Sequence, residues 1–358
     1  MIGRRDFFGA TAGALVMSQA LQSEARAAAA NLAPLTGPAK SYLPRGVDGR
    51  IARLATLDLE SLQDFTLGFR LMHSKALRAS SAAAFERVLE REGIDLLTPI
   101  SAEDVRRLVD TEPAINIASK AWLANQQVTW KTLRDHFHAY ADYYLSEMEA
   151  ADKSGPGALE LAPSLDIPAY ARHEIHIQPG GYVGDPFAGH IYHYGTNSFY
   201  ISVIGDNEQD QVHKATAARL PIPVDGKVRR ILDMGCGIGQ MTVALKERFP
   251  DNYFDLATSY IVHHELPAEV TRKVIAEAQR VTRPGGVYYP IDFNSGGTKS
   301  PARMMYSRWY DHRWNNEVWS LEYHSLNFTN EIAARGFNVV KNAKPALPGF
   351  GVRHTVKA

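Results

Sequence analysis

Cysteine is nearly absent from this chain of 358 residues, because Cys236 is the only one. No intrachain disulfide can form, and a cysteine-based zinc site is excluded. A net charge is absent as well, since 39 basic side chains are balanced by 39 acidic ones. Proteins dedicated to nucleic acids usually carry a basic excess, so this balance predicts no nucleic-acid partner.

Long hydrophobic runs are also missing. No apolar run reaches the roughly 20 residues that a membrane-spanning helix needs, so we expect no stable membrane span. Within residues 1–30, the pair Arg4 and Arg5 precedes a short apolar run, and Ala25-Arg26-Ala27 offers a small-residue cleavage site. This order is typical of a secretory signal, and the arginine pair resembles a twin-arginine signal.

Two cellular locations are possible, depending on whether this segment acts as a signal. A functional twin-arginine-type signal predicts a periplasmic or exported protein, and an unused one predicts a cytoplasmic protein. The alternative interpretation of residues 1–30 is an alanine-rich N-terminal helix or tail that carries no address.

Composition divides the rest of the chain into four regions. Residues 31–56 repeat proline and glycine, which indicates a linker. Apolar residues at three- and four-residue steps predict a small all-helical domain at 57–153. The glycine- and aromatic-rich residues 154–226 predict an irregular connector. From 227 to 358, apolar strands alternate with helices, which predicts an α/β domain with a mostly parallel sheet.

Two apolar stripes in the helical region are expected to lie in its core. The first comprises Leu59, Leu62, Phe65, Phe69 and Met72. The second comprises Trp130, Leu133, Phe137, Tyr140, Tyr144 and Met148. Ser101 precedes Asp104 by three positions, a spacing that predicts the capped start of a helix.

A glycine-rich turn follows the first strand predicted in the α/β domain, and a helix follows the turn. The turn contains Asp233, Gly235, Cys236, Gly237 and Gly239. Glycine lets a backbone turn tightly and lets a ligand approach it. The free N–H groups at the start of the helix suit an anionic group, and Asp233 can accept hydrogen bonds from an ammonium or hydroxyl group. The G-x-G-x-G spacing departs from the G-x-G-x-x-G dinucleotide fingerprint.

This turn resembles the first motif of the class I S-adenosylmethionine-dependent methyltransferases, an acid followed by alternating glycines. Residues 253–260 resemble the family's fourth strand, residues 274–280 its next helix, and residues 283–287 its turn into the fifth strand. The resemblance implies a Rossmann-like sheet with S-adenosylmethionine as the cofactor. It also implies a cofactor site made of Asp233, Gly235, Cys236, Gly237, Gly239 and Tyr260.

The resemblance is incomplete after the glycine turn. The family places two further strand–helix units before its fourth strand, whereas only residues 240–252 separate Gly239 from Tyr253. A parallel strand pair needs a crossover of a dozen or more residues, so one crossover fits and three do not. We therefore expect a shortened sheet, with an internal deletion at residues 249–251 and no identified ribose- or adenine-binding residue.

The deletion has a geometric consequence. The family's first and fourth strands are neighbours, so the shortened connection can still close a parallel pair. Crossovers are right-handed in about 98% of cases. The helix after the glycine turn must therefore change sheet face, or its crossover must be left-handed, and a strand edge is exposed either way.

Candidate catalytic residues follow the fourth strand, where the family places substrate-facing groups. We expect His264 or Glu265 to act as a base toward a substrate oxygen or nitrogen, and the alternative is a polar cluster without a chemical role. No H-E-x-x-H motif occurs, and we predict no metal site. The aromatic segment 304–323 either lines an acceptor or, as we favour, packs against the helical domain.

Two functions remain open. The first is a methyltransferase that acts on an unidentified small-molecule acceptor and is impaired by a truncated cofactor site. The alternative is a catalytically inactive protein of the same fold that binds a ligand or partner. No sequence feature indicates an oligomeric state.

Overall fold

A computed structural model describes residues 42–48, 51–154, 158, 160, 164–178, 184–204, 209–228, 230–248, 254–351 and 353–358. The signal-like segment 1–30, part of the linker and the expected deletion junction at 249–251 lie outside these residues. The chain divides into two compact units, Met1–Thr66 with Gln126–Thr196 and Leu67–Asn125 with Asn197–Ala358. The helical region 57–153 contributes residues to both units, so the domain boundaries stay a prediction.

The first unit is mainly helical. Its own elements are the antiparallel pair β1 (Val47–Asp48) and β2 (Ile51–Ala52), helix α6 (Ala141–Ser154) and a 3-10 turn at Ala169–Ala171. Three longer helices contribute residues to both units: α2 (Leu57–Met72), α5 (Pro113–Ala139) and α7 (Ala188–Ile204).

The two predicted apolar stripes have different outcomes. The second is confirmed at its main positions, since Trp130, Leu133, Phe137 and Tyr144 are buried. The prediction for α2 is wrong, because Leu62 and Phe65 are 39% and 68% exposed while the polar residues Gln63 and Thr66 are buried. Gln63 tolerates burial because its side-chain amide donates to the Thr129 carbonyl. Periodicity identified the helix but not the face that packs.

The region predicted to be an irregular connector contains two helices, α7 and α8 (Gln209–Arg219). The expectation of irregular structure is wrong, because a glycine in this region lies within a helix and not in a turn. Gly195 lies inside α7, where an added Cβ would come within 2.3 Å of Cζ3 of Trp130. Glycine at this position permits close packing against an indole ring.

The second unit begins with helices around a short strand pair. These elements are a π-helical turn (His73–Leu77), α3 (Arg78–Arg91), β3 (Pro99–Ser101), α4 (Ala102–Val109), β7 (Lys299–Pro301) and α11 (Ala302–Trp314). Strands β3 and β7 pair antiparallel. The capped helix start is confirmed, because the Ser101 hydroxyl accepts from the Asp104 N–H and the Asp104 carboxylate accepts from the Ser101 N–H.

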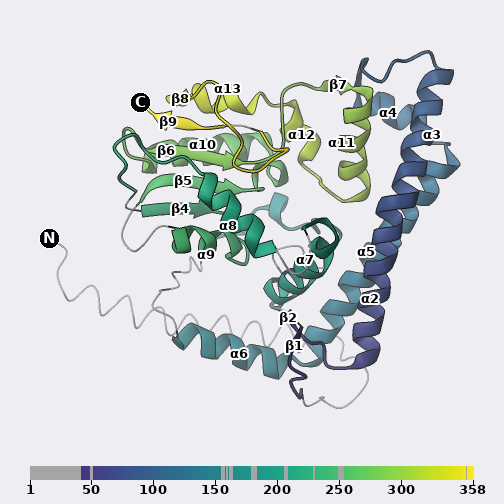
Figure 1. The fold of residues 1–358 in the computed structure, drawn as a ribbon, viewed down its shortest axis with the longest axis horizontal. Helices are drawn as coiled ribbons and strands as arrows, with labels where there is room; N and C mark the ends of the chain where they lie inside the picture. The colour runs from purple at the N-terminus through teal and green to yellow at the C-terminus, as the bar shows by residue number, and fades with distance from the viewer. Residues whose placement is uncertain are drawn as a thin grey trace. The chain divides into compact units, whose positions relative to one another are not determined.

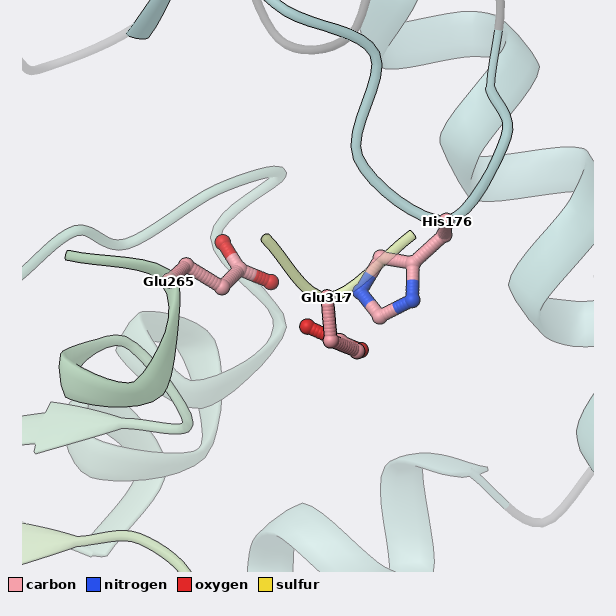
Figure 2. Close-up of side chains that lie close together, drawn as sticks. All are labelled: His176, Glu265 and Glu317. Carbon is pink, nitrogen blue, oxygen red and sulfur yellow. The ribbon is translucent and has the colours of Figure 1, made fainter. Parts of the chain in front are cut away.

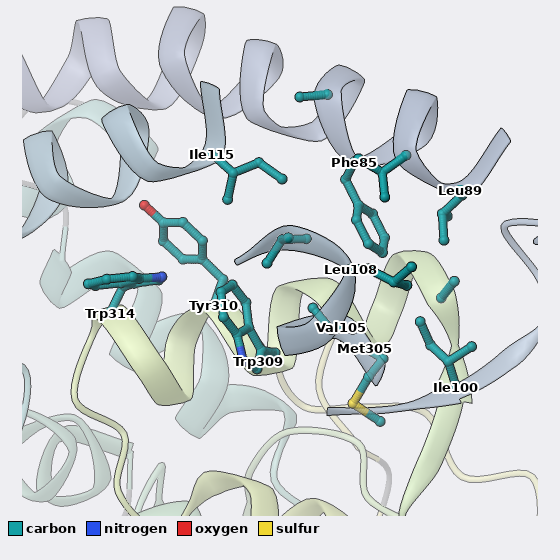
Figure 3. Close-up of a cluster of buried hydrophobic side chains, with 14 residues drawn as sticks. Phe85, Leu89, Ile100, Val105, Leu108, Ile115, Met305, Trp309, Tyr310 and Trp314 are labelled. Carbon is teal, nitrogen blue, oxygen red and sulfur yellow. The ribbon is translucent and has the colours of Figure 1, made fainter. Parts of the chain in front are cut away.

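The aromatic segment after β7 packs into a hydrophobic core. Trp309, Tyr310 and Trp314 of α11 are buried together with side chains of α3, α4 and α5, among them Phe85 and Ile115 (Figure 3). The favoured interpretation, packing against the helical part of the chain, is therefore confirmed for these rings.

A five-stranded sheet forms the rest of the second unit. Its strands are β4 (Arg230–Met234), β5 (Phe254–Tyr260), β6 (Val287–Ile291), β8 (Phe337–Val339) and β9 (Thr355–Lys357), in the order β4-β5-β6-β9-β8. Strands β4, β5 and β6 are parallel and lie side by side, whereas β9 is antiparallel to both of its neighbours (Figure 1). The expected neighbouring first and fourth family strands correspond to β4 and β5.

Helices cover both faces of this sheet. They are α9 (Gln240–Arg248), a 3-10 turn (His263–Glu265), α10 (Ala268–Val281), α12 (Ser320–Ser325) and α13 (Phe328–Ala333), in addition to α8. Met241 and Leu245 of α9 pack with Leu256 on one face. Ile275 of α10 packs with Ala257, the next residue of β5, on the other face. The architecture is thus a Rossmann-like α/β fold.

The two crossovers of the parallel strands have opposite hands. The step from β4 to β5 and the step from β5 to β6 run in the same direction across the sheet. Their helices, α9 and α10, nevertheless lie on opposite faces. One of the two connections is therefore left-handed, which is rare among parallel strands. This is the second of the two geometries expected for a shortened connection.

In the part of the chain that the structure describes, no helix combines the length and the apolar character needed to cross a membrane.

Candidate active site

The carboxyl ends of the three parallel strands bring most of the candidate residues to one edge of the sheet. Asp233 lies one residue before the end of β4, Tyr260 ends β5, and Asp292 directly follows β6. Open α/β sheets bind ligands outside this edge.

The turn after β4 depends on backbone conformations that favour glycine. Gly235, Gly237 and Gly239 have φ angles of 69°, 53° and 80°. The Gly239 N–H donates to the Cys236 carbonyl at 2.8 Å, which closes the turn just before α9. Gly235, Cys236 and Gly237 are exposed, so the turn presents its backbone to a ligand.

Asp233 is half-buried beside this turn. Its Oδ2 accepts a hydrogen bond from the Thr242 hydroxyl at 2.6 Å, whereas no group in the described residues donates to its buried Oδ1. Burial raises the pKa of Asp233, and the bond from Thr242 opposes this shift. A ligand ammonium or hydroxyl group would satisfy Oδ1 and favour the charged carboxylate.

Tyr260 lies on the α8 side of the site. Its ring centre is 4.8 Å from that of the buried His213 of α8. The contribution of Tyr260 to cofactor binding stays a prediction, as do those of Asp233 and the glycines.

A buried His–Asp pair stands at the ends of β5 and β6. The Nδ1 atom of His264 lies 2.9 Å from Oδ1 of Asp292, and both side chains are almost fully buried. Asp292 also accepts from the backbone N–H groups of His263, His264 and Phe293. The carboxylate therefore orients the imidazole ring and caps the 3-10 turn that carries it.

The charges of this pair depend on each other. Burial lowers the pKa of His264, but the Asp292 charge and hydrogen bond outweigh it, and the pKa rises to about 10. Burial likewise opposes the charge of Asp292, yet the His264 cation holds its pKa at about 2. His264 is therefore an imidazolium at neutral pH in the free protein.

Two more carboxylates lie near the far side of the His264 ring. Its Nε2 atom is 3.9 Å from Oε1 of Glu265 and 3.7 Å from Oε2 of Glu317. An oxygen of Glu265 and an oxygen of Glu317 lie within 4.8 Å of each other, and the Glu265 carboxylate points toward Glu317 (Figure 2). The side chain of Glu265 is 15% exposed, against 2% for His264, so an acceptor reaches Glu265 more easily.

His263 differs from its neighbour although both rings are buried. Its Nε2 atom pairs with the Tyr288 hydroxyl at 3.1 Å, and its ring contacts Phe328. Burial lowers the pKa of His263 to about 4, so this ring is neutral at pH 7. Its surroundings are those of a core residue.

The family model described as a methyltransferase domain matches residues 245–289. This segment of the chain is therefore similar to part of a methyltransferase domain. The match runs from α9 through β5 and α10 into β6, and it includes the 3-10 turn with His264 and Glu265. The match agrees with the resemblance of the acid and glycine turn after β4 to the S-adenosylmethionine-dependent methyltransferases. The glycine turn itself precedes the matched residues.

Solved methyltransferase structures show a limited likeness to the whole chain. Mitomycin 7-O-methyltransferase MmcR has 12% identity and a TM-score of 0.34, with 84% of this chain and 97% of that chain covered. The O-methyltransferase family 2 protein from Planctomyces limnophilus DSM 3776, solved in complex with apigenin, has 14% identity and a TM-score of 0.33, with 85% and 97% covered. The S-adenosylmethionine-dependent methyltransferase SibL has 14% identity and a TM-score of 0.33, with 84% and 99% covered. None of the curated proteins matches the chain.

The structure brings His264 and Glu265 together, as their adjacency requires. It adds two carboxylates that were not predicted from the sequence, Asp292 and Glu317. Asp292 had a sequence signal, because an acid directly after a buried strand lies at the ligand edge of a parallel sheet. Glu317 lies among aromatic residues between α11 and α12 and had no comparable signal.

Proposed function

We propose that this methyltransferase domain transfers a methyl group from S-adenosylmethionine to a small-molecule acceptor bound near His264 and Glu265. The observation that carries the proposal is the buried His264–Asp292 pair, which lies on the same sheet edge as the glycine turn. A charged pair without solvent is costly, and such pairs concentrate at functional sites.

The glycine turn fits the amino-acid end of the cofactor. The exposed backbone of Gly235 and Gly237 allows close approach, and the buried Oδ1 of Asp233 accepts a donor such as an ammonium group. No residue for the ribose end of the cofactor is identified. Strand β4 is the edge strand among the described residues, so no neighbouring strand beyond it contributes one there. The cofactor, when bound, supplies a methyl group on a positively charged sulfur.

The groups around His264 can stabilise charge on the acceptor and remove its proton. As an imidazolium, His264 stabilises negative charge that develops on an acceptor oxygen. Glu265, the more exposed carboxylate, takes the proton from the acceptor. At the same time the acceptor's oxygen or nitrogen bonds to the methyl carbon, and the bond between this carbon and the cofactor's sulfur breaks. The aligned approach of the two reactants supplies most of the acceleration. Of the two predicted bases, the electrostatics therefore favour Glu265.

The first experiment is calorimetric titration with S-adenosylmethionine and S-adenosylhomocysteine. We expect heat of binding for both ligands, and weaker binding by Asp233→Asn, which removes the charge that pairs with an ammonium group. Asp64→Asn, at an exposed position of α2, is the matched control. An absence of heat at millimolar ligand at two different temperatures would exclude the enzyme.

The alternative function, a catalytically inactive binding protein of this fold, is favoured by a specific observation. Among the described residues β4 is an edge strand, and one of the two parallel crossovers is left-handed, as expected after loss of two strand–helix units. Transfer of a radioactive methyl group separates the two functions. Cofactor binding without transfer to any member of a panel of phenols, amines and carboxylic acids would support the binding protein.

We also propose export through the twin-arginine-like segment at residues 1–30. N-terminal sequencing of the protein from a periplasmic fraction should begin after Ala27. Recovery only from the cytoplasm, with Met1 retained, would refute export.

A further inference from the structure

Arg353 is a buried arginine that the proposed chemistry does not use. It is 2% exposed and lies just before β9. Its guanidinium donates to the backbone carbonyls of Asp292, at 2.9 Å, and Phe293. It also donates to the Tyr323 hydroxyl at 2.9 Å. Two of these bonds reach the segment that follows β6. The third reaches Tyr323, whose hydroxyl is itself hydrogen-bonded to that segment.

Neighbouring groups complete this arrangement. The Tyr323 hydroxyl donates to the Phe293 carbonyl at 2.7 Å, and the Gly351 N–H donates to the Asp292 carbonyl at 2.9 Å. The Arg353 guanidinium lies 4.8 Å from the centre of the Phe328 ring. An added Cβ at Gly351 would come within 2.5 Å of Nη1 of Arg353, so the guanidinium packs directly on the glycine backbone.

The two sides of Asp292 therefore have different partners. Its carbonyl faces Arg353 and Gly351, whereas its carboxylate faces the His264 ring and the 3-10 turn. Movement of the peptide at residues 292–293 would displace the carboxylate from His264. We propose that Arg353 is a positioning residue that holds this peptide so that the Asp292 carboxylate stays aligned with the His264 ring. The catalytic consequence rests on the proposed function, whereas the alignment itself does not.

Arginine is suited to this position by its shape. Its planar group donates in several fixed directions, which allows bonds to two successive carbonyls and a hydroxyl, whereas the lysine ammonium is a compact point charge. Several charged or titratable groups surround the pair. They are His263, Glu265, Tyr288, Glu317, Tyr323, His324 and Arg353. A useful substitution must leave these charges unchanged, so Arg353→Lys is preferred to a neutral residue.

The test follows the charge state of His264 by nitrogen-15 NMR of the full-length protein labelled in histidine, with His264→Gln used to assign the signals. In the unsubstituted protein we expect His264 to lose its proton near pH 10. Arg353→Lys should lower this midpoint by about one pH unit, because a misaligned carboxylate stabilises the cation less. A general loss of stability would not move the midpoint in the folded protein.

Arg248→Lys is the matched control. Arg248 also donates to two backbone carbonyls, but these belong to Ala217 and Leu220 at the end of α8 and not to the segment after β6. We expect its His264 midpoint to equal that of the unsubstituted protein. An equal midpoint in folded Arg353→Lys as well would overturn the proposal.

Tyr323→Phe provides a second variant if Arg353→Lys does not fold. It removes one acceptor of Arg353 and one donor to Phe293 but keeps the ring, so a smaller decrease of the His264 midpoint supports the proposal and no decrease overturns it. The measurement requires no turnover. A failure of methyl transfer in the unsubstituted protein would therefore refute the proposed function without affecting this result.

Discussion

The two halves of the candidate site differ in how far their hydrogen bonds are complete. At β6, every strand residue is buried, and Asp292 accepts hydrogen bonds from three backbone N–H groups and the His264 ring. At β4, no strand residue is buried, and Oδ1 of Asp233 has no donor among the described residues. The Asp292 carboxylate has its partners in the free protein, whereas the Asp233 carboxylate leaves a polar atom for a ligand.

This difference separates two ways of building a site. Burying a charge requires that its partners be present during folding, so the His264–Asp292 half must assemble with the core. An exposed glycine turn has no such requirement, because its polar groups can form their hydrogen bonds when a ligand binds. The less complete half is also the half at the sheet edge, where the deletion is expected.

The largest effect should come from removing the carboxylate of the His264–Asp292 half. Asp292→Ala leaves the His264 cation buried without its partner, so we expect the free energy of unfolding to fall by about 3–5 kcal/mol. Urea denaturation at pH 7 measures this. Glu269→Ala, at an exposed helix position, should change it by less than about 0.5 kcal/mol. Equal losses in the two variants would show that the pair does not stabilise the fold.

The pH dependence of stability should separate the two adjacent histidines. The pKa of His264 is raised to about 10, so its stabilising contribution is complete below about pH 6.5 and is lost as the pH rises toward 10. The pKa of His263 is lowered to about 4, so its contribution is present above about pH 6.5 and is lost as the pH falls toward 4. At about 1.4 kcal/mol per pKa unit, the change should be on the order of 5 kcal/mol for His264 and on the order of 3 kcal/mol for His263.

Unfolding measured from pH 4 to pH 10 in His264→Gln and His263→Gln checks these slopes. The difference between His264→Gln and the unsubstituted protein should shrink at high pH, and that for His263→Gln should shrink at low pH. Two parallel profiles would contradict the assignment of opposite charge states.

A smaller effect is expected in the glycine turn. Gly235→Ala would place a Cβ within 2.9 Å of the Val262 side chain in a backbone with a φ of 69°, which should cost about 2 kcal/mol. Gly237→Ala meets nothing within 4 Å, so only its positive φ should matter, at about 1 kcal/mol. Thermal unfolding should rank the two variants in this order, and a reversed order would mean that the contact with Val262 is absent.

The smallest effect should come from the thiol at the centre of the turn. Cys236 is exposed, and its thiol makes a weak contact with the Gly237 carbonyl. Cys236→Ser should therefore change the free energy of unfolding by less than about 0.5 kcal/mol. Denaturation of this variant beside Gly235→Ala tests whether the turn depends on its backbone more than on its side chains.

Local patterns predicted much of the α/β domain. The acid and glycines after β4, the proline and glycines before β6 and the capping pair at Ser101 each express a short-range requirement that the structure meets. The burial of α2 and the helix through Gly195 were not predictable in this way. Both depend on a partner that is remote in sequence. The partner is Thr129 for Gln63 and Trp130 for Gly195.

The candidate site shows the same limit. His264 and Glu265 were identified from their place after a strand, but their charge states depend on Asp292 and Glu317, 28 and 53 positions away from His264. Sequence reasoning therefore named both candidate bases without distinguishing them. The distinction came from which side chain is buried against a carboxylate and which is exposed.

The isolation of Cys236 has a practical consequence. Because the chain has a single thiol and it lies exposed in the glycine turn, one maleimide dye would label one known position without further engineering. The fluorescence of that dye would report directly on occupancy of the turn, even for ligands that release no heat and undergo no reaction.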